Sequence, residues 1–442
     1  MERWTSRVGF ILAAVGAAVG LGNIWRFPAV VGQNGGGAYL LPYLLAAVGL
    51  AIPLLIFELS IGRSLRADVV TACRRVRPQL EWVGWVVGVS VLAILSYYLV
   101  IAGWVLAFLA ASIVGADITF DGLTETIWPI VLFVLIALVV GGIVSLGVVD
   151  GIERMARTVV PLAFVIIAGL AVYAVTLDGF AEGIRYFVTP ELDALGDPFV
   201  WSAAFGQVFF SFSVGMGIML TYGSYLEGET PIARSAVTIA VADLLVALLA
   251  GVFIFAVVFT HGIEPTIGTE LAFESLPTGF EAMGLGWLVA PAFFALLFVA
   301  ALAPSVSMLE VGVAATMQRF ELGRKRATAA VMTLVLLAGL PAALSYSAVE
   351  LTLGGRPVLD VIDASVGTFA LPIGAVLLVI VFAWVQDRTV FELQLPNRAL
   401  RLLVAVVAPI VLVGVTLTRV LAGREFTAWR RPNHQWSRLG KR

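Results

Sequence analysis

Long apolar runs separated by short polar connections dominate this chain. Eleven runs can be drawn, at approximately 8–30, 38–62, 82–113, 126–147, 157–177, 199–223, 234–260, 286–317, 328–348, 357–386 and 399–421. Because a helix of about 20 apolar residues crosses the hydrocarbon core of a bilayer, each run is long enough to span a membrane. The pattern predicts an all-α, multi-pass membrane protein with about eleven spans.

The composition narrows the classes of function. The 442 residues are 60% hydrophobic and 13% charged, whereas a soluble chain carries roughly 25% charged residues. This excludes a soluble enzyme, a disordered chain and a nucleic-acid binder, and it makes the lipid bilayer the expected surroundings. One cysteine and two distant histidines offer neither a disulfide framework nor a metal-site spacing. The apolar runs contain no nucleophile–base pair, so we do not expect an enzyme.

Basic residues are unevenly distributed between the two sets of connections. With the N-terminus in the cytoplasm, the cytoplasmic connections hold most of the arginines, and the opposite ones hold only Arg185 and Arg356 among acidic residues. Positive charge resists translocation, so we predict a cytoplasmic N-terminus and a retained first span. Eleven spans would leave the basic tail, 422–442, outside. Either this tail is translocated or one run is miscounted.

Two of the runs are interrupted by residues that do not suit a regular membrane helix. The first contains Gly16, Gly20 and Gly22 within seven residues, followed by Asn23. The sixth combines glutamine, serines and glycines over 206–217. Close packing of helices through small residues is one interpretation. A helix broken at mid-membrane is the other, and such a break is tolerated only where it lines a cavity or is covered by protein.

The positions of the two interrupted runs favour broken helices. As first and sixth runs they divide the chain into two five-helix repeats, about 8–177 and 199–386, followed by an extra helix at about 399–421 and the tail. Paired broken spans indicate a transporter site at the bilayer midplane. Free N–H groups at half-helix N-termini suit an anion, and unwound carbonyls suit a cation. A zwitterion accompanied by a cation fits this arrangement.

These residues resemble the neurotransmitter:sodium symporter family, and its prokaryotic amino-acid transporters best. The resemblance covers most of the chain. It rests on nine ordered motifs: Gly20-Leu21-Gly22-Asn23-Ile24-Trp25-Arg26-Phe27-Pro28, Asn34-Gly35-Gly36-Gly37-Ala38-Tyr39, Pro42-Tyr43, Gly62-Arg63, Tyr97-Tyr98, Gly151-Ile152-Glu153-Arg154, Gly206-Gln207-Val208-Phe209-Phe210, Thr221-Tyr222-Gly223-Ser224-Tyr225 and Leu359-Asp360. It implies an inverted five-plus-five helix repeat (the leucine-transporter-type fold), alternating access, and import of a neutral amino acid with sodium across a prokaryotic inner membrane.

The resemblance also implies a substrate site and a first sodium site. The sodium ligands would be the Ala18 carbonyl, Asn23, Ser211, Asp243 and the substrate carboxylate, all of which offer the oxygens that hard cations take. The substrate would lie among Ala18, Leu21, Gly22, Ile94, Tyr98, Phe210, Ser211, Ser213, Met216, Pro304 and Met308. Because this lining is apolar and offers no counter-charge to a side chain, we expect hydrophobic or aromatic amino acids.

Asp243 is a functional candidate on physical grounds alone. A carboxylate within an apolar run is costly and by default marks a site. Many family members have a neutral amide here, and chloride-dependent ones place a hydroxyl one turn later, where this chain has Ala247. We expect Asp243 to replace a bound chloride, near Tyr43, Gln207 and Ser211, so that chloride is not required.

The second sodium site of the family is incomplete in this chain. Its backbone ligands would be Gly16, Val19 and Ala300, but the hydroxyl pair aligns with Ala303 and Pro304, which have no side-chain oxygen. Ser305, one residue later, could substitute only if Pro304 kinks the helix. We therefore expect one or two sodium ions, with a single ion or an altered second site as the hypothesis.

The gates are partly retained. Arg26 and Asp363 align with the outer ion pair, above an aromatic lid of Tyr98 and Phe210. At the inner gate the usual arginine is displaced to Arg3, and its acidic partner aligns with Gln318. The family's remaining inner residues are Trp4, Tyr225 and Glu310, and Glu58 would support the unwound part of the sixth span.

The sequence is compatible with three functions. The first is a sodium-coupled amino-acid symporter, working as a monomer or weak dimer. The second is a proton-coupled or facilitative carrier on the same fold, favoured by the missing hydroxyls and by Asp243. The third is a membrane-embedded amino-acid sensor that does not transport, for which the altered inner gate leaves room.

Overall fold

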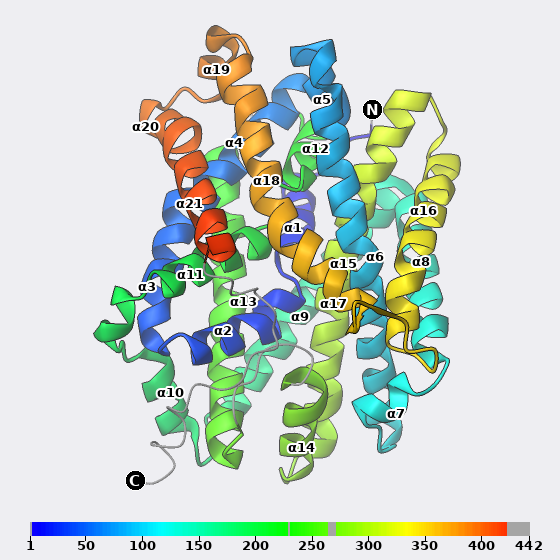
Figure 1. Cartoon of the computed structure of the whole chain (residues 1–442), viewed down its shortest axis with the longest axis vertical. Helices are drawn as coiled ribbons and strands as arrows, with labels where there is room; N and C mark the ends of the chain where they lie inside the picture. Colours follow the sequence, from blue (N-terminus) through cyan, green and yellow to red (C-terminus); the bar gives the residue numbers. More distant parts are fainter. Residues whose placement is uncertain (1, 229, 264–270, 422–442) are drawn as a thin grey trace.

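A computed structural model describes residues 2–228, 230–263 and 271–421. Helices account for nearly all regular structure, and the bundle they form is shown in Figure 1. The helices that form most of the predicted spans are α1 (Arg7–Ala18), α2 (Phe27–Gln33), α3 (Gly37–Ala46), α4 (Ile52–Leu65), α6 (Glu81–Val114), α8 (Trp128–Ser145), α9 (Arg154–Ala174), α11 (Pro198–Ser211), α12 (Ile218–Ser224), α13 (Ile232–His261), α15 (Gly286–Phe320), α16 (Arg324–Ser345), α18 (Thr368–Val379) and α21 (Ala408–Leu421).

Further elements connect or extend these helices. They are α5 (Val69–Val76), α7 (Phe120–Thr124), α10 (Phe180–Val188), α14 (Leu276–Glu281), α17 (Val358–Ile362), α19 (Arg388–Gln394) and α20 (Arg398–Leu402), with a two-stranded antiparallel hairpin of β1 (Thr352–Leu353) and β2 (Arg356–Pro357) before α17. Single wider turns continue several spans, as at Gly22–Arg26 before α2 and Val148–Glu153 before α9.

The expected spans are all present as helix. Within the described residues, nine helices are long and apolar enough to cross a membrane. A tenth span is the pair Arg7–Ala18 and Gly22–Gln33, which is bent by 56° at its break. The sixth predicted run is occupied by α11 and α12, each too short to cross alone. The prediction of an all-α fold with broken first and sixth spans is confirmed, and the basic tail 422–442 lies outside the described residues.

The outer surface of the bundle is apolar, as contact with lipid requires. Large hydrophobic side chains on α8, α9, α16 and α21 are exposed, including Leu138, Val172, Leu337 and Ile410. Apolar side chains are unfavourable in water, so an exposed surface of this kind is stable in contact with lipid chains. The exposed belt therefore agrees with the membrane assignment made from the sequence.

The first span runs through the interior of the bundle. Almost the whole C-terminal half of α1 is buried, and α1 packs against α9, α13 and α15 (Figure 1). The two longest helices, α6 and α15, pack closely on each other, and α12 packs on α4. Gly62 permits this last contact, since a Cβ built there would lie 1.9 Å from the carbonyl oxygen of Leu220. The broken helices are thus surrounded by protein, which satisfies the condition for unwound backbone in a membrane.

Candidate functional site

The break in the first span exposes backbone groups that find partners inside the protein. Helix α1 ends at Ala18, and Val19 is extended at φ −71°, ψ 103°. The N–H of Gly20 donates to Asn23 Oδ1 over 3.1 Å, and the N–H of Leu21 donates to the hydroxyl of Tyr98 over 3.3 Å. Side chains from the same turn and from α6 therefore replace the missing helical hydrogen bonds.

The sixth span is broken over residues 212–217. Ser213, Gly215 and Gly217 have φ of 52°, 83° and 67°, a region that glycine adopts without strain. The N–H of Gly215 donates to Glu58 Oε1 over 2.7 Å, so Glu58 contacts the unwound part of the sixth span. A Cβ at Gly215 would lie 2.5 Å from the Leu371 carbonyl oxygen. The unwound segment is thus held by α4 and α18.

Three polar side chains from three spans form a buried cluster beside the first break. Asn23 Nδ2 donates to Ser211 Oγ over 2.8 Å and to Asp243 Oδ1 over 2.7 Å. Ser211 Oγ donates to Asp243 Oδ2 over 2.7 Å. All three residues are at most 1% exposed. The sequence separations of 188 and 220 residues show that only the fold brings this cluster together.

Further uncommitted oxygens surround this cluster. Gln207 donates through Nε2 to the Gly22 carbonyl over 3.1 Å, while its Oε1 and the hydroxyl of Tyr43 are buried and have no hydrogen-bond partner among the described residues. Buried polar atoms are normally satisfied, so unsatisfied ones point to an ion or water. With Asp243, Asn23 and Ser211, these atoms form an oxygen-rich set that suits a hard cation such as sodium.

A small cavity lies between the two breaks. Its volume is about 30 Å³, and it is lined by Ala17, Ala18, Gly20, Asn23, Ile94, Tyr98, Phe210, Ser213, Met216, Pro304 and Met308. Eight of the residues predicted to bind substrate are among these; Leu21, Gly22 and Ser211 lie beside them. Ala17 and Gly20 were not predicted, although their place in the broken turn would have indicated them. A larger recess between α11 and α21 contains none of the predicted residues.

Ser213 connects the two broken spans across this cavity. Its hydroxyl donates to the carbonyl of Ala17 over 2.8 Å, so an unwound residue of the sixth span bonds the last turn of α1. Phe210 closes one side, and a Cβ at Gly22 would lie 2.6 Å from the Phe210 ring. The two breaks are therefore in direct contact.

The second ion position is enclosed mainly by groups that do not bind cations. A Cβ at Gly16 would lie 3.1 Å from Ala303 Cβ and 3.0 Å from a Val160 methyl. The hydroxyl of Ser305 donates to Ala301 in its own helix over 2.8 Å and is not directed toward Gly16. The Ala300 carbonyl accepts from Tyr98 over 3.4 Å. An incomplete second sodium site stays a prediction.

Aromatic and charged residues meet at Phe210, which lines the cavity, and at the neighbouring turn of Asp363. The guanidinium of Arg26 lies 4.8 Å from the ring centroid of Phe210. Asp363, in the turn between α17 and α18, accepts from the hydroxyl of Tyr97 over 2.9 Å. Tyr97 was missed as a site residue, although it precedes Tyr98. The ion pair between Arg26 and Asp363 stays a prediction.

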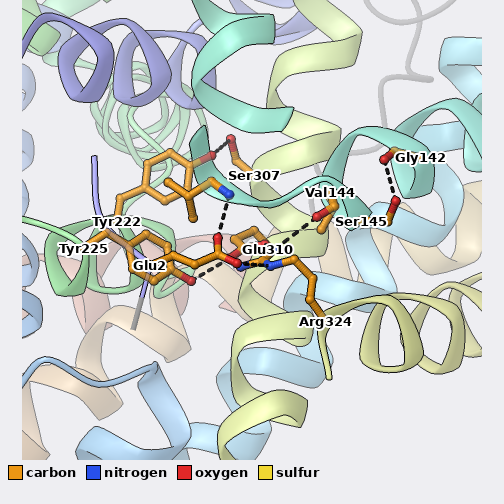
Figure 2. A network of polar contacts seen from close by, with 10 residues as sticks. Glu2, Gly142, Val144, Ser145, Tyr222, Tyr225, Ser307, Glu310 and Arg324 are labelled. Atoms are coloured by element: carbon orange, nitrogen blue, oxygen red, sulfur yellow. Dashed lines mark hydrogen bonds and ion pairs between the residues drawn. The ribbon is translucent and has the colours of Figure 1, made fainter. Parts of the chain in front are cut away.

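The other side of the bundle, where the chain begins, is closed by a polar network (Figure 2). Arg324 donates to Glu310 through Nη1 over 2.7 Å and Nη2 over 2.9 Å, and to Glu2 through Nε over 2.7 Å. The hydroxyl of Tyr225 donates to Glu310 over 2.5 Å, and that of Tyr222 shares a 2.7 Å hydrogen bond with Ser307. Glu310 is fully buried.

The segment before α1, residues 2–6, is fastened to this network. Trp4 Nε1 donates to the carbonyl of Tyr222 over 3.0 Å, and its ring contacts those of Tyr222 and Tyr225. Thr5 donates through its N–H to Glu153 over 2.9 Å, and Arg3 pairs with Glu227. Trp4, Tyr225 and Glu310, which were predicted to belong to the inner gate, therefore meet in this network. Arg324 and Glu2, which the sequence reading missed, supply its other charges.

The fold and site together define a multi-pass membrane transporter with two helices broken around a central cavity. Comparison with known proteins agrees. Residues 1–117 and 114–437 match the sequence profile of the sodium:neurotransmitter symporter family, and the chain belongs to that family. Its members are transporters and not enzymes.

The relatives include bacterial and animal proteins. The chain is 34% identical over 395 residues to an uncharacterized sodium-dependent transporter of Bacillus subtilis, covering 85% of this chain and 86% of that one. It is 31% identical over 295 residues to the sodium-dependent neutral amino acid transporter B(0)AT2 of Bos taurus, covering 58% of this chain and 40% of that one. Among solved structures, MhsT in complex with L-phenylalanine superposes with a TM-score of 0.86 at 37% identity, covering 95% of this chain and 99% of MhsT.

Proposed function

We propose that this protein imports neutral, hydrophobic or aromatic amino acids together with sodium, by alternating access in a prokaryotic cell membrane. The observation that carries the proposal is the contact between a cavity at two helix breaks and the buried Asn23–Ser211–Asp243 cluster. The cavity would widen to take the zwitterion, and the adjoining cluster would take the cation. The bound L-phenylalanine in MhsT and the neutral amino acids named for the bovine relative support this substrate class.

The substrate would be oriented by backbone groups. The N–H groups near Leu21 and Gly22, with the Tyr98 hydroxyl, would bind its carboxylate, because they carry the positive end of the peptide dipoles. The ammonium would face the carbonyls near Ala18 and Phe210. Ile94, Met216 and Met308 would contact the side chain, and methionines adapt their shape to different apolar groups. A charged side chain would lack a counter-charge among these residues.

Sodium would occupy the first site. The carboxylate of Asp243 supplies a fixed negative charge, and Ala18, Asn23 and Ser211 supply neutral oxygens. The Asn23 amide would turn its oxygen toward the ion in place of the N–H groups that now bond Ser211 and Asp243. The negative charge of Asp243 would already balance the positive charge of the sodium ion. We therefore propose that transport needs no chloride.

We propose that one sodium ion accompanies each substrate. Ala303 and Pro304 have no hydroxyl, and the Ser305 hydroxyl is bonded within its own helix. The second site would then offer only the backbone carbonyls of Gly16, Val19 and Ala300. These are too few oxygen ligands to bind a second sodium ion tightly. A cytoplasmic N-terminus, a monomer or weak dimer, and repeats at about 8–177 and 199–386 belong to the same proposal.

Uptake into proteoliposomes tests the function. Purified protein is reconstituted, and radiolabelled L-phenylalanine uptake is measured with an inward sodium gradient against equimolar potassium or choline, with chloride and pH varied independently. Accumulation that needs sodium and persists in gluconate supports the proposal. Uptake that follows pH without sodium would select a proton-coupled carrier, and sodium-dependent binding without flux would select a sensor.

A further inference from the structure

The hydroxyl of Tyr98, on α6, bridges two backbone groups on different spans. It accepts from the N–H of Leu21 over 3.3 Å and donates to the carbonyl of Ala300 on α15 over 3.4 Å. The side chain is 5% exposed, so water does not readily replace these partners. A tyrosine carries a single O–H, and it therefore donates to one acceptor at a time. In this structure that acceptor is a carbonyl of the protein.

Pro304 explains why the Ala300 carbonyl is available. In a regular α-helix the carbonyl of residue 300 accepts from the N–H of residue 304. Proline has no N–H, so the regular donor is missing inside α15. Ala300 and Pro304 are both buried, and an unpaired buried carbonyl is destabilising. Tyr98 supplies the hydrogen bond that the helix cannot make.

The same residues meet at the cavity. Tyr98 and Pro304 both line it, together with Gly20. A Cβ built on Gly20 would lie 3.4 Å from Pro304 Cγ and 3.4 Å from the Tyr98 hydroxyl oxygen. An anionic group held at the first break would lie within reach of this hydroxyl. It would compete with the Ala300 carbonyl for the hydrogen bond that the hydroxyl donates.

We propose that the Tyr98 O–H exchanges between the Ala300 carbonyl in the empty protein and the substrate carboxylate in the bound protein, and that Pro304 sets the cost of this exchange. The proposal rests on the proposed function. Substrate binding leaves the Ala300 carbonyl without its hydrogen-bond donor. The free energy lost there offsets part of the favourable free energy of the hydrogen bond to the substrate carboxylate. Pro304 is then an affinity-determining residue, although it gives the substrate no polar group.

A double-mutant cycle tests the exchange. Dissociation constants for L-phenylalanine are measured at saturating sodium for the wild type, Pro304→Ala, Tyr98→Phe and the double variant. Pro304→Ala restores the helical N–H, so Ala300 stays paired when Tyr98 turns to the carboxylate. We expect binding to tighten about two- to tenfold, the range of one net hydrogen bond. With Tyr98→Phe in place, Ala300 lacks Tyr98 in both states, and the same substitution should change binding less than twofold.

Thermal unfolding without substrate gives an independent measurement. Pro304→Ala should raise the melting temperature more in the Tyr98→Phe protein, where it rescues an unpaired carbonyl, than in the wild type. Pro291→Ala is the matched control: it removes another proline from the interior of α15, away from the cavity, and should show no coupling to Tyr98.

The outcomes separate the two proposals. Equal effects of Pro304→Ala in both backgrounds, or no tightening, would overturn the exchange while leaving sodium-coupled transport intact. Wild-type protein that binds no amino acid in sodium would overturn both proposals, and the unfolding measurement would still report whether Tyr98 pairs with Ala300.

Discussion

Arg324 holds Glu310 through two parallel hydrogen bonds, from Nη1 to Oε2 and from Nη2 to Oε1, at the side of the bundle where the chain begins. The Glu310 side chain is fully buried and that of Arg324 is 11% exposed. Because a buried charge without its partner is strongly destabilising, this pair favours the conformation in which this side of the bundle is closed.

Arg324→Ala should therefore open the side of the bundle where the chain begins. Loss of one partner of a buried pair costs about 3–5 kcal/mol, which is enough to shift a conformational equilibrium almost completely. Ser307→Cys provides a reporter, since Ser307 contacts Tyr222 in the same network. We expect the Arg324→Ala protein to react much faster with a membrane-impermeant thiol reagent, and the buried Cys73 to contribute little background.

Arg319→Ala is the matched control for this measurement. Arg319 is in the last turn of α15 and pairs with Glu81, but its side chain is 42% exposed. An exposed pair contributes about 0–1 kcal/mol, so the labelling rate should stay near that of the parent. Equal labelling of the Arg324 and Arg319 variants would contradict a gating role for the Arg324–Glu310 pair.

Asp243→Asn should weaken sodium binding. The substitution keeps the shape of the side chain but removes its charge from the cluster with Asn23 and Ser211. A charge-assisted interaction is worth about 1.5–3 kcal/mol, so the sodium concentration for half-maximal uptake should rise roughly 10- to 100-fold. Asp150→Asn, an exposed carboxylate, should change nothing. Retained sodium affinity in the Asp243 variant, or wild-type uptake that requires chloride, would refute the assigned role.

The double substitution Ala303→Thr with Pro304→Ser should add a second coupled ion. It introduces hydroxyls at the two positions that align with the family's hydroxyl pair, and Ala303 lies next to Gly16, since a Cβ built on Gly16 would be 3.1 Å from Ala303 Cβ. Reversal potentials in proteoliposomes should give one sodium per substrate for the wild type and two for the variant. A wild-type ratio of two would exclude the single-ion hypothesis.

The broken spans could be predicted because their cause is local. Glycine and polar residues within an apolar run weaken a helix wherever the run lies, so the sequence alone indicated interruptions within 16–23 and 206–217. The residues that stabilise these breaks could not be predicted from local sequence. The contact of Glu58 with Gly215 joins residues 157 positions apart and was expected only through the family resemblance.

Side-chain direction and long-range charge pairing could not be predicted. Whether Ser305 faces an ion or its own helix depends on its rotamer, and the fold selects the bond to Ala301. Arg324 reaches Glu310 because the chain reverses between α15 and α16, with Glu321 at φ 53°. Glu2 lies 322 residues away from Arg324 in sequence. No periodic pattern relates such residues.

The acidity of Asp68, in the connection between the second and third spans, gives a pH prediction. Its Oδ1 caps α5 by accepting from the N–H groups of Val70 and Thr71, while burial raises the pKa of its carboxyl above the usual value. A raised pKa means that the folded protein favours the protonated acid. The contribution of Asp68 to the stability of the folded protein is therefore greatest at low pH. It falls as the pH rises from the ordinary pKa of the carboxyl through its raised pKa.

Asp68→Asn should remove this pH-dependent loss while keeping the cap, because asparagine is an equally good N-cap residue. The melting temperature in detergent should fall less in the variant than in the wild type over that pH interval. Asp68→Ala should also remove the pH dependence, but at a cost of about 1 kcal/mol from the lost cap. Identical pH profiles for the wild type and the asparagine variant would contradict the raised pKa.

Close contact between α4 and α12 gives a prediction about packing. Gly62→Ala would place a methyl group 1.9 Å from the Leu220 carbonyl, and backbone cannot yield as a flexible side chain can. Overpacking of this kind costs about 1–3 kcal/mol, so the melting temperature should fall. Gly88→Ala, in the interior of α6 with nothing within 4 Å of the added carbon, should be neutral or stabilising by up to about 1 kcal/mol. Because α12 follows the break in the sixth span, Gly62→Ala should also reduce uptake, whereas an unchanged melting temperature would show that the two helices can separate freely.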